Sequence, residues 1–304
     1  MKKVFATISI ILVMSVLCIS LVACSNNVRT EGQLANLLND HNHEQFEYLV
    51  EALDENNTAL DGYYAQTGSY KVTLDAYANG ATVENFGNAT LENVKKGVLV
   101  RCELNYGETK YQTGCYFALI SGTGYMVPAY TFRVESKNGV EQFRLQGVYD
   151  GATLNYERWI NGEKSTGSVS AKGTYYDNNE FHQSLRTITT FSTNFSFSFA
   201  VPVVSARETS VPTLRATISK EVNVKTQFTE NNETYKEDGI LCYKMFLTRN
   251  AEVVNASQVI YFAKDAISSN GWDLKHVIVQ FEEPFKLDGK YCKMVYTLQT
   301  ASLS

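Results

Sequence analysis

The feature that most constrains this fold is the regular return of Asn-Gly and Asp-Gly pairs between runs of strand-forming residues. Eight of the 19 glycines follow Asn or Asp, at positions 61–62, 79–80, 138–139, 150–151, 161–162, 238–239, 270–271 and 288–289. Such pairs favour positive φ at both centres of a two-residue turn, as tight hairpins require. Strands joined by connections this short pair antiparallel, because a parallel pair needs a long crossover. We therefore expect a mainly β chain.

The runs between these turns predict a series of strands. They cover 70–77, 98–104, 111–120, 125–134, 142–149, 152–160 and 165–176, and then 215–228, 240–248, 258–262, 276–281 and 290–299. The clearest strand covers 194–204, where Phe195, Phe197 and Phe199 alternate with smaller residues, so one face is expected to be buried. Pro202 cannot donate to a ladder, which predicts a sheet edge or the end of the strand at that point.

Apolar residues at helical spacing predict a few helices around these strands. The helices are expected over 31–39, 43–54, 179–190 and 264–269, with apolar stripes at Leu34, Leu37 and Leu38 in the first, at Phe46, Leu49, Val50 and Leu53 in the second, and at Phe181, Leu185 and Ile188 in the third. The third is expected to cross over the sheet.

Together these elements predict a curved antiparallel sheet, half-barrel or sandwich-like, with short N-terminal helices and a crossover helix near 179–190. The predicted order is a signal peptide (1–23), a lipid anchor and tether (24–30), a helical lead-in (31–60), an antiparallel β region with one helix (61–205) and a second β-rich region (206–304). The second β region forms either a separate unit or one domain continuous with the first.

The first 24 residues carry the pattern of an export signal. Lys2 and Lys3 precede a long apolar run, which ends in Leu21-Val22-Ala23-Cys24. This segment resembles the lipobox of bacterial lipoprotein precursors, and the resemblance is confined to residues 1–24. It implies cleavage before Cys24, a diacylglycerol on its sulfur, and anchoring in membrane lipid on the extracytoplasmic face of the cell membrane. Two acyl chains anchor stably where one would not. The alternatives are an ordinary signal peptide and an uncleaved anchor helix.

The later cysteines form an even set of four, Cys102, Cys115, Cys242 and Cys292. In an exported chain this number favours two disulfides. A hairpin turn centred on Glu108-Thr109 would place Cys102 opposite Cys115, which would leave Cys242 to pair with Cys292. The alternative is four buried free thiols that pack as small hydrophobic side chains.

No recognised catalytic or metal-binding motif occurs in the chain. Ser-x-x-Lys, Gly-x-Ser-x-Gly, His-Glu-x-x-His, Walker and dinucleotide-binding patterns are all missing, and no Cys-x-x-Cys pair suggests zinc. The Glu282-Glu283 pair is most simply solvated charge, and His182 a residue on a helix surface. A formal net charge of −5 without a basic block argues against nucleic acid. We therefore expect a protein that is not an enzyme and needs no cofactor or metal.

The expected function is binding. The candidates to line an apolar ligand site between helix and sheet, suited to lipid, are Phe181, Leu185, Ile188, Phe195, Phe197 and Phe199. Such a helix-covered half-barrel resembles bacterial envelope carriers of lipids and lipoproteins, in architecture alone. The alternative is an interaction lipoprotein that presents a sheet rich in its 19 tyrosines to a protein or glycan partner. An enzyme without a recognisable motif is the third class.

Replacing Cys24 tests the anchor. The Cys24→Ala variant has no sulfur to acylate, so we expect it to leave the detergent phase on phase separation and to lose the mass of the diacylglycerol. Intact-mass spectrometry of both proteins measures this. A Cys24→Ala protein that stays in the membrane with an unchanged processing site would contradict the lipobox interpretation.

Overall fold

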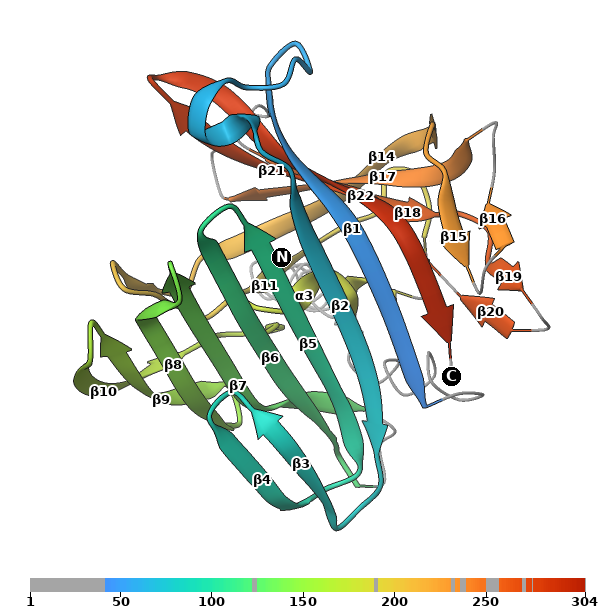
Figure 1. Ribbon diagram of the computed structural model, residues 1–304. Coiled ribbons are helices and arrows are strands. Elements are labelled where there is room, and N and C mark those ends of the chain that lie inside the picture. Colours follow the sequence, from blue (N-terminus) through green and yellow to red (C-terminus); the bar gives the residue numbers. More distant parts are fainter. Residues whose placement is uncertain are drawn as a thin grey trace, which may run out of the picture.

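The computed structural model describes residues 42–121, 125–188, 191–230, 233–235, 239–249, 257–269, 272–274 and 276–303. Most of this chain lies in strands, as the sequence predicts (Figure 1). The signal peptide, Cys24, the tether and the helix expected over 31–39 lie outside the described residues. Among the described residues, no helix has the length and apolarity that crossing a bilayer requires.

One large sheet dominates the molecule, and the strands along its main path are antiparallel to their neighbours. In sheet order, one half consists of β10 (Glu163–Ser170), β9 (Thr153–Ile160), β8 (Val140–Asp150), β7 (Met126–Lys137), β6 (Thr109–Leu119), β5 (Gly97–Tyr106), β2 (Gly68–Tyr77) and β1 (His43–Asp54). The other half continues from β1 with β22 (Lys290–Leu303), β21 (Ile278–Leu287), β18 (Gln258–Ala263), β17 (Ile240–Arg249), β14 (Thr213–Val224) and β11 (Ser196–Ala200).

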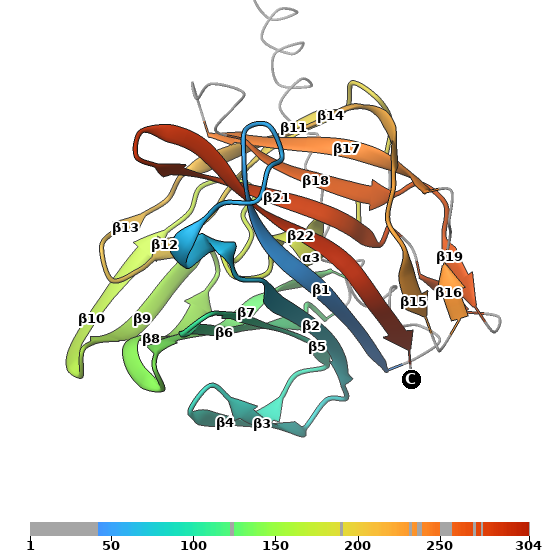
Figure 2. The same ribbon diagram turned by 45° about the horizontal axis from the view of Figure 1, so that its top comes forward.

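Shorter elements decorate this sheet. They are η2 (Gly62–Ala65), α3 (Phe181–Leu185) and the strands β3 (Ala81–Phe86), β4 (Ala89–Val94), β12 (Val203–Val204), β13 (Thr209–Ser210), β15 (Phe228–Glu230), β16 (Glu233–Tyr235), β19 (Ile267–Ser269) and β20 (Trp272–Leu274). The β3–β4 hairpin lies outside β5–β7 (Figure 2), where Val83 and Phe86 pack on Tyr116 and Phe132. The prediction of a helix over 264–269 is wrong, because β19 begins at Ile267 and pairs with β20.

The sheet curves around α3 without closing (Figures 1 and 2). Its end strands β10 and β11 are not paired with each other along the described path. Side chains of β9 instead contact the β12–β13 hairpin: Arg158 donates from Nη1 to the Ser205 carbonyl at 3.1 Å, and the hydroxyls of Tyr156 and Thr209 lie 3.3 Å apart. The two β-rich regions are thus one continuous sheet, since β1 pairs with both β2 and β22.

Turn chemistry explains much of this order. Both residues of Asn138-Gly139, Asn161-Gly162 and Asp288-Gly289 have positive φ, as the predicted two-residue turns require. Each turn joins neighbouring strands that then pair along their length.

Residues 43–54 form a strand, so the predicted helical lead-in is wrong there. The stripe of Phe46, Leu49, Val50 and Leu53 fits a helix, but burial follows every second residue, and Glu44, Phe46, Tyr48, Val50 and Ala52 are the buried set. The strand form is favoured because it lies between β2 and β22 and satisfies hydrogen bonds on both sides.

The predicted cysteine pairing also differs from the structure, where all four thiols are free and buried. Gly107 has a φ of +57° and Tyr106 faces Thr109, so the turn lies one residue earlier than expected. The register therefore shifts by two residues, and Cys102 faces Thr113 instead of Cys115. Cys242 and Cys292 lie on β17 and β22, which β18 and β21 separate.

The crossover helix is shorter than predicted, since α3 covers only Phe181–Leu185, and it lies inside the curved sheet (Figure 1). Phe181, Leu185 and Ile188 are buried, as their spacing predicts. The strand expected over 194–204 ends at Ala200, and β11 is an edge strand, in agreement with the position of Pro202. Phe199 on β11 and Val201 just after its end are buried.

An ion pair fixes the interior segment to the sheet. Arg186 directly follows α3 and is 1% exposed, and its Nη1 lies 2.7 Å from Oε2 of Glu44, which is equally buried on β1. The guanidinium also lies over the ring of Phe46, 4.7 Å from its centroid. Because burial deprives both charges of water, each needs the other.

We expect Arg186→Met to destabilise the fold by about 3–5 kcal/mol, because the buried carboxylate of Glu44 loses the positive charge beside it. The double variant with Glu44→Met removes both charges and should recover most of that loss. Urea unfolding of the two variants and the wild type measures the difference. A single variant that loses less than about 1 kcal/mol would show that the pair is not critical to the fold.

Candidate functional site

A cavity of about 490 Å³ lies inside the curved sheet, next to α3. Its wall combines polar side chains, among them Arg133, Asn178, Asn179 and Gln258, with the aromatic side chains of Tyr64, Tyr70, Tyr106, Tyr111, Phe181, Phe281 and Tyr296. Leu104 and Met294 add aliphatic surface. Cavities of this size with apolar walls and a few polar groups are typical of small-molecule sites.

The register of the strands builds the aromatic wall. Phe281 on β21 lies directly opposite Tyr296 on β22, and their rings stack with centroids 3.9 Å apart. Tyr70, on β2, meets both rings edge-on, at 5.6 Å and 5.3 Å. Because side chains alternate along a strand, the same register turns the intervening residues away from the cavity.

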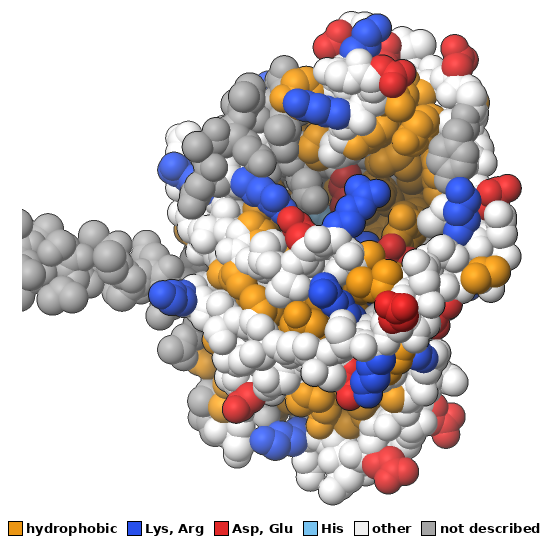
Figure 3. Space-filling model, turned by 90° about the vertical axis from the view of Figure 1, so that its left-hand side faces the viewer, with side chains coloured by type: hydrophobic (Ala, Val, Ile, Leu, Met, Phe, Trp, Pro, Cys, Tyr) orange, Lys and Arg blue, Asp and Glu red, His pale blue; other side chains and the backbone are white. Residues whose placement is uncertain are grey.

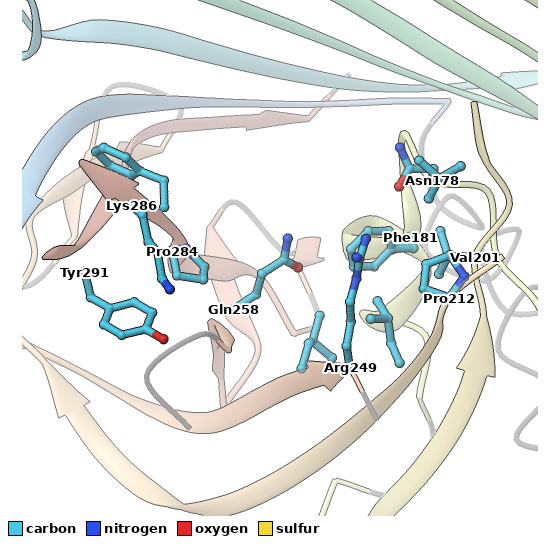
Figure 4. Close-up of a pocket in the computed structure, with 13 residues that line it drawn as sticks. Asn178, Phe181, Val201, Pro212, Arg249, Gln258, Pro284, Lys286 and Tyr291 are labelled. Carbon is cyan, nitrogen blue, oxygen red and sulfur yellow. The ribbon is translucent and has the colours of Figure 1, made fainter. Parts of the chain in front are cut away.

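A second hollow of about 620 Å³ adjoins the cavity and shares Asn178, Phe181 and Gln258 with it. Figure 4 shows Arg249 and Lys286 reaching into this hollow from different walls. Figure 3 shows a hollow in the molecular surface with hydrophobic side chains on its wall and Lys or Arg side chains around the opening. Neither Arg249 nor Lys286 forms an ion pair with a described carboxylate, and Lys286 lies over the ring of Tyr291 at 4.9 Å.

Glu283 is the acidic group on the cavity wall. Tyr296 donates its hydroxyl to Glu283 Oε2 at 2.9 Å. Burial raises the pKa of Glu283, while the Tyr296 hydrogen bond and the charge of Arg133 oppose this rise. The sequence interpretation of Glu282-Glu283 as solvated charge is therefore wrong for both residues. Glu282 lies on the opposite face of β21, is 15% exposed, and pairs with Lys293 at 3.1 Å.

His182 also lines the cavity, instead of the exposed helix surface expected from sequence. Its Nε2 lies 3.3 Å from Oε1 of Gln258, and its ring contacts Phe181 and Phe281. Burial lowers the pKa of His182 to about 4, against the smaller effect of the Gln258 hydrogen bond. The imidazole is therefore neutral at pH 7 and adds a polar but uncharged group to the wall.

Of the six residues predicted to line a ligand site, Phe181 alone lies on the two cavities. Leu185, Ile188 and Phe199 are at most 1% exposed and fill the core beneath α3. Phe195 and Phe197 are half-buried and pack against that core from the edge strand. The sequence predicted tyrosines on a sheet face for a protein or glycan partner and not on the wall of a cavity, although the alternation of Tyr70 or Tyr296 with their neighbours could have placed them on an inner face.

A second group of polar side chains is buried where β6 passes the start of α3. Cys115, Asp177 and Glu180 approach until their potential ligand atoms all lie within 4.8 Å of one another. Asp177 accepts hydrogen bonds from the Tyr149 hydroxyl at 2.7 Å and from the Asn179 amide at 2.9 Å. Burial and then the charge of Asp177 raise the pKa of Glu180 well above its usual range.

Comparison with known proteins gives little beyond this geometry. No protein-family model matches the chain, and no curated protein matches its sequence. Among solved structures it is similar to a beta-barrel-like protein of a domain of unknown function from Brucella abortus, at 10% sequence identity and a TM-score of 0.45. The match covers 87% of this chain and 98% of that one. Function is therefore inferred from the cavity itself.

Proposed function

We propose that this protein is a membrane-anchored extracytoplasmic lipoprotein that binds an apolar or amphipathic ligand, such as a lipid, without chemical conversion. The observation that carries the proposal is the aromatic-lined cavity inside the sheet. A packed core would have filled this space, yet about 490 Å³ remains between α3 and the strands. The lipobox sequence supports the anchor, which would hold the binding domain close to lipid.

The walls favour a ligand with a flat or flexible apolar part. Tyrosine and phenylalanine offer large contact areas at a low cost in conformational entropy. The Phe281–Tyr296 stack and the edge of Tyr70 form a rigid surface, because each ring is already packed by its neighbours. A preformed surface of this kind reduces the ordering cost of binding.

The opening favours an anionic group on the same ligand. Arg249 and Lys286 extend into the second hollow, and no described carboxylate pairs with either. An anionic ligand group there would gain two partners while staying near water, where Coulomb attraction is modest and desolvation is small. The apolar part would then enter past Phe181, which borders both spaces.

A cavity-filling substitution tests the proposal. Leu104 lines the cavity on β5, so Leu104→Trp should occupy the space and lower the affinity for a fluorescent fatty acid by at least about 10-fold. The matched control is Val148→Trp, because Val148 is 50% exposed on β8 and its substitution leaves the cavity untouched. Fluorescence titration and urea unfolding of chains that begin at Ser25 separate lost binding from lost stability.

A double substitution at the opening tests separately whether the ligand carries an anionic group. Changing Arg249 and Lys286 to Gln together should lower the affinity for the fatty acid by about 5-fold, since the charge contact is lost. The affinity for a neutral apolar probe of similar length should not change. A wild-type protein that takes up neither probe would overturn the carrier function and favour a protein or glycan partner instead.

A further inference from the structure

The buried polar group of Cys115, Asp177 and Glu180, at the start of α3, is a second candidate for a ligand site. Cys115 is 0% exposed on β6, and Asp177 and Glu180 are each 1% exposed around the start of α3. Their nearest Sγ and carboxylate oxygen atoms lie within 4.8 Å of one another. Three potential metal ligands from two distant segments thus meet in a space that water does not reach.

The hydrogen bonds of the two carboxylates are unequal. Asp177 is held by Tyr149, Asn179 and Thr131, the last at 3.2 Å. Neither oxygen of Glu180 has a hydrogen-bond donor outside the group itself. Buried polar atoms in folded proteins are normally satisfied, and a buried carboxylate without donors is costly. Glu180 therefore points its unsatisfied oxygens at the same space as Cys115 and Asp177.

No described basic side chain offsets this group. None of the ion pairs formed by the described Lys, Arg and His residues includes Asp177 or Glu180, and the nearest buried cation of the interior segment, Arg186, is paired with Glu44. Without a cation the group can stay buried only if Glu180 and Cys115 keep their protons, and burial accordingly raises the pKa of both side chains. A divalent cation would supply both the missing charge and the missing partner for Glu180.

We propose that Cys115, Asp177 and Glu180 bind one divalent transition-metal ion of the zinc class. A thiolate with two carboxylates suits a borderline-soft ion, whereas calcium and magnesium prefer oxygen ligands throughout. Tyr149 and Asn179 then orient Asp177 from behind, as outer partners commonly orient metal ligands. Three protein ligands leave at least one coordination position for water or a neighbouring side chain.

The metal ion would have a structural role. It would tie β6 to the start of α3, and Asn178 and Asn179, between the two acidic ligands, line the ligand cavity. The metal would thus hold the wall of the cavity in place, and it would enter during folding because the formed site is buried. A spacing of Asp-x-x-Glu with a cysteine more than 60 residues earlier explains why no sequence motif shows it.

The test uses the full chain in detergent, unfolded with a chelator and refolded with or without one equivalent of Zn²⁺. We expect one tightly held zinc per chain by inductively coupled plasma mass spectrometry and a higher Tm in the zinc-loaded protein. Refolding with Co²⁺ should give thiolate-to-metal charge-transfer absorption. Glu180→Gln and Cys115→Ser should each lower the affinity for zinc by at least about 10-fold, and only Cys115→Ser should abolish the charge-transfer absorption.

Cys242→Ser is the matched control, since Cys242 is an equally buried thiol on β17. It should keep the zinc and the Co²⁺ absorption. The wild-type measurement decides the matter even if a variant fails to fold. Wild-type protein without stoichiometric zinc, or zinc that Glu180→Gln and Cys115→Ser retain as well as the control does, would overturn the site. If the Tm of Glu180→Gln is higher than that of the wild type and is the same with and without zinc, the group is a proton-sharing acid pair instead of a metal site.

Discussion

The buried pair of Arg186 and Glu44 is the interaction on which the interior of this protein depends. It joins the segment that contains α3 to β1, the strand where the two halves of the sheet meet. A short helix such as α3 has little stability of its own, because so few hydrogen bonds offset its nucleation. Its place inside the sheet therefore depends on contacts with the walls, and this charge pair is the most specific of them.

With the segment fixed in this way, its two sides have different surroundings. Leu185 and Ile188 complete a packed core, whereas Phe181 and His182 border open space beside the tyrosines of the opposite wall. Glu283 and a neutral His182 add polar groups to that space without filling it. A long, curved sheet of hairpins encloses an interior that is too wide for one short helix to fill. The proposed ligand site is the interior space that α3 does not occupy.

Much of the sheet can be predicted from turn residues and alternation, because both act over a few neighbouring positions. Asn138-Gly139 and Asp288-Gly289 specify their hairpins locally. The error at 43–54 arose because Phe46, Leu49, Val50 and Leu53 match helical spacing, whereas pairing with β22, more than 200 residues away, makes the segment a strand that buries every second residue. The register at Cys102 depended on which residue of a loop adopts positive φ. The cavity was predicted on the wrong face of α3, since no local pattern shows which side the sheet leaves unfilled.

The central claim is that the aromatic cavity holds a ligand. Native mass spectrometry of the protein released from its own membrane in mild detergent tests this most directly. We predict a complex heavier than the polypeptide and its anchor by one small amphipathic molecule, which is lost on denaturation and on substitution of Leu104 by Trp. A mass that matches the acylated polypeptide alone, in a protein that also excludes added fatty acid, would contradict the account.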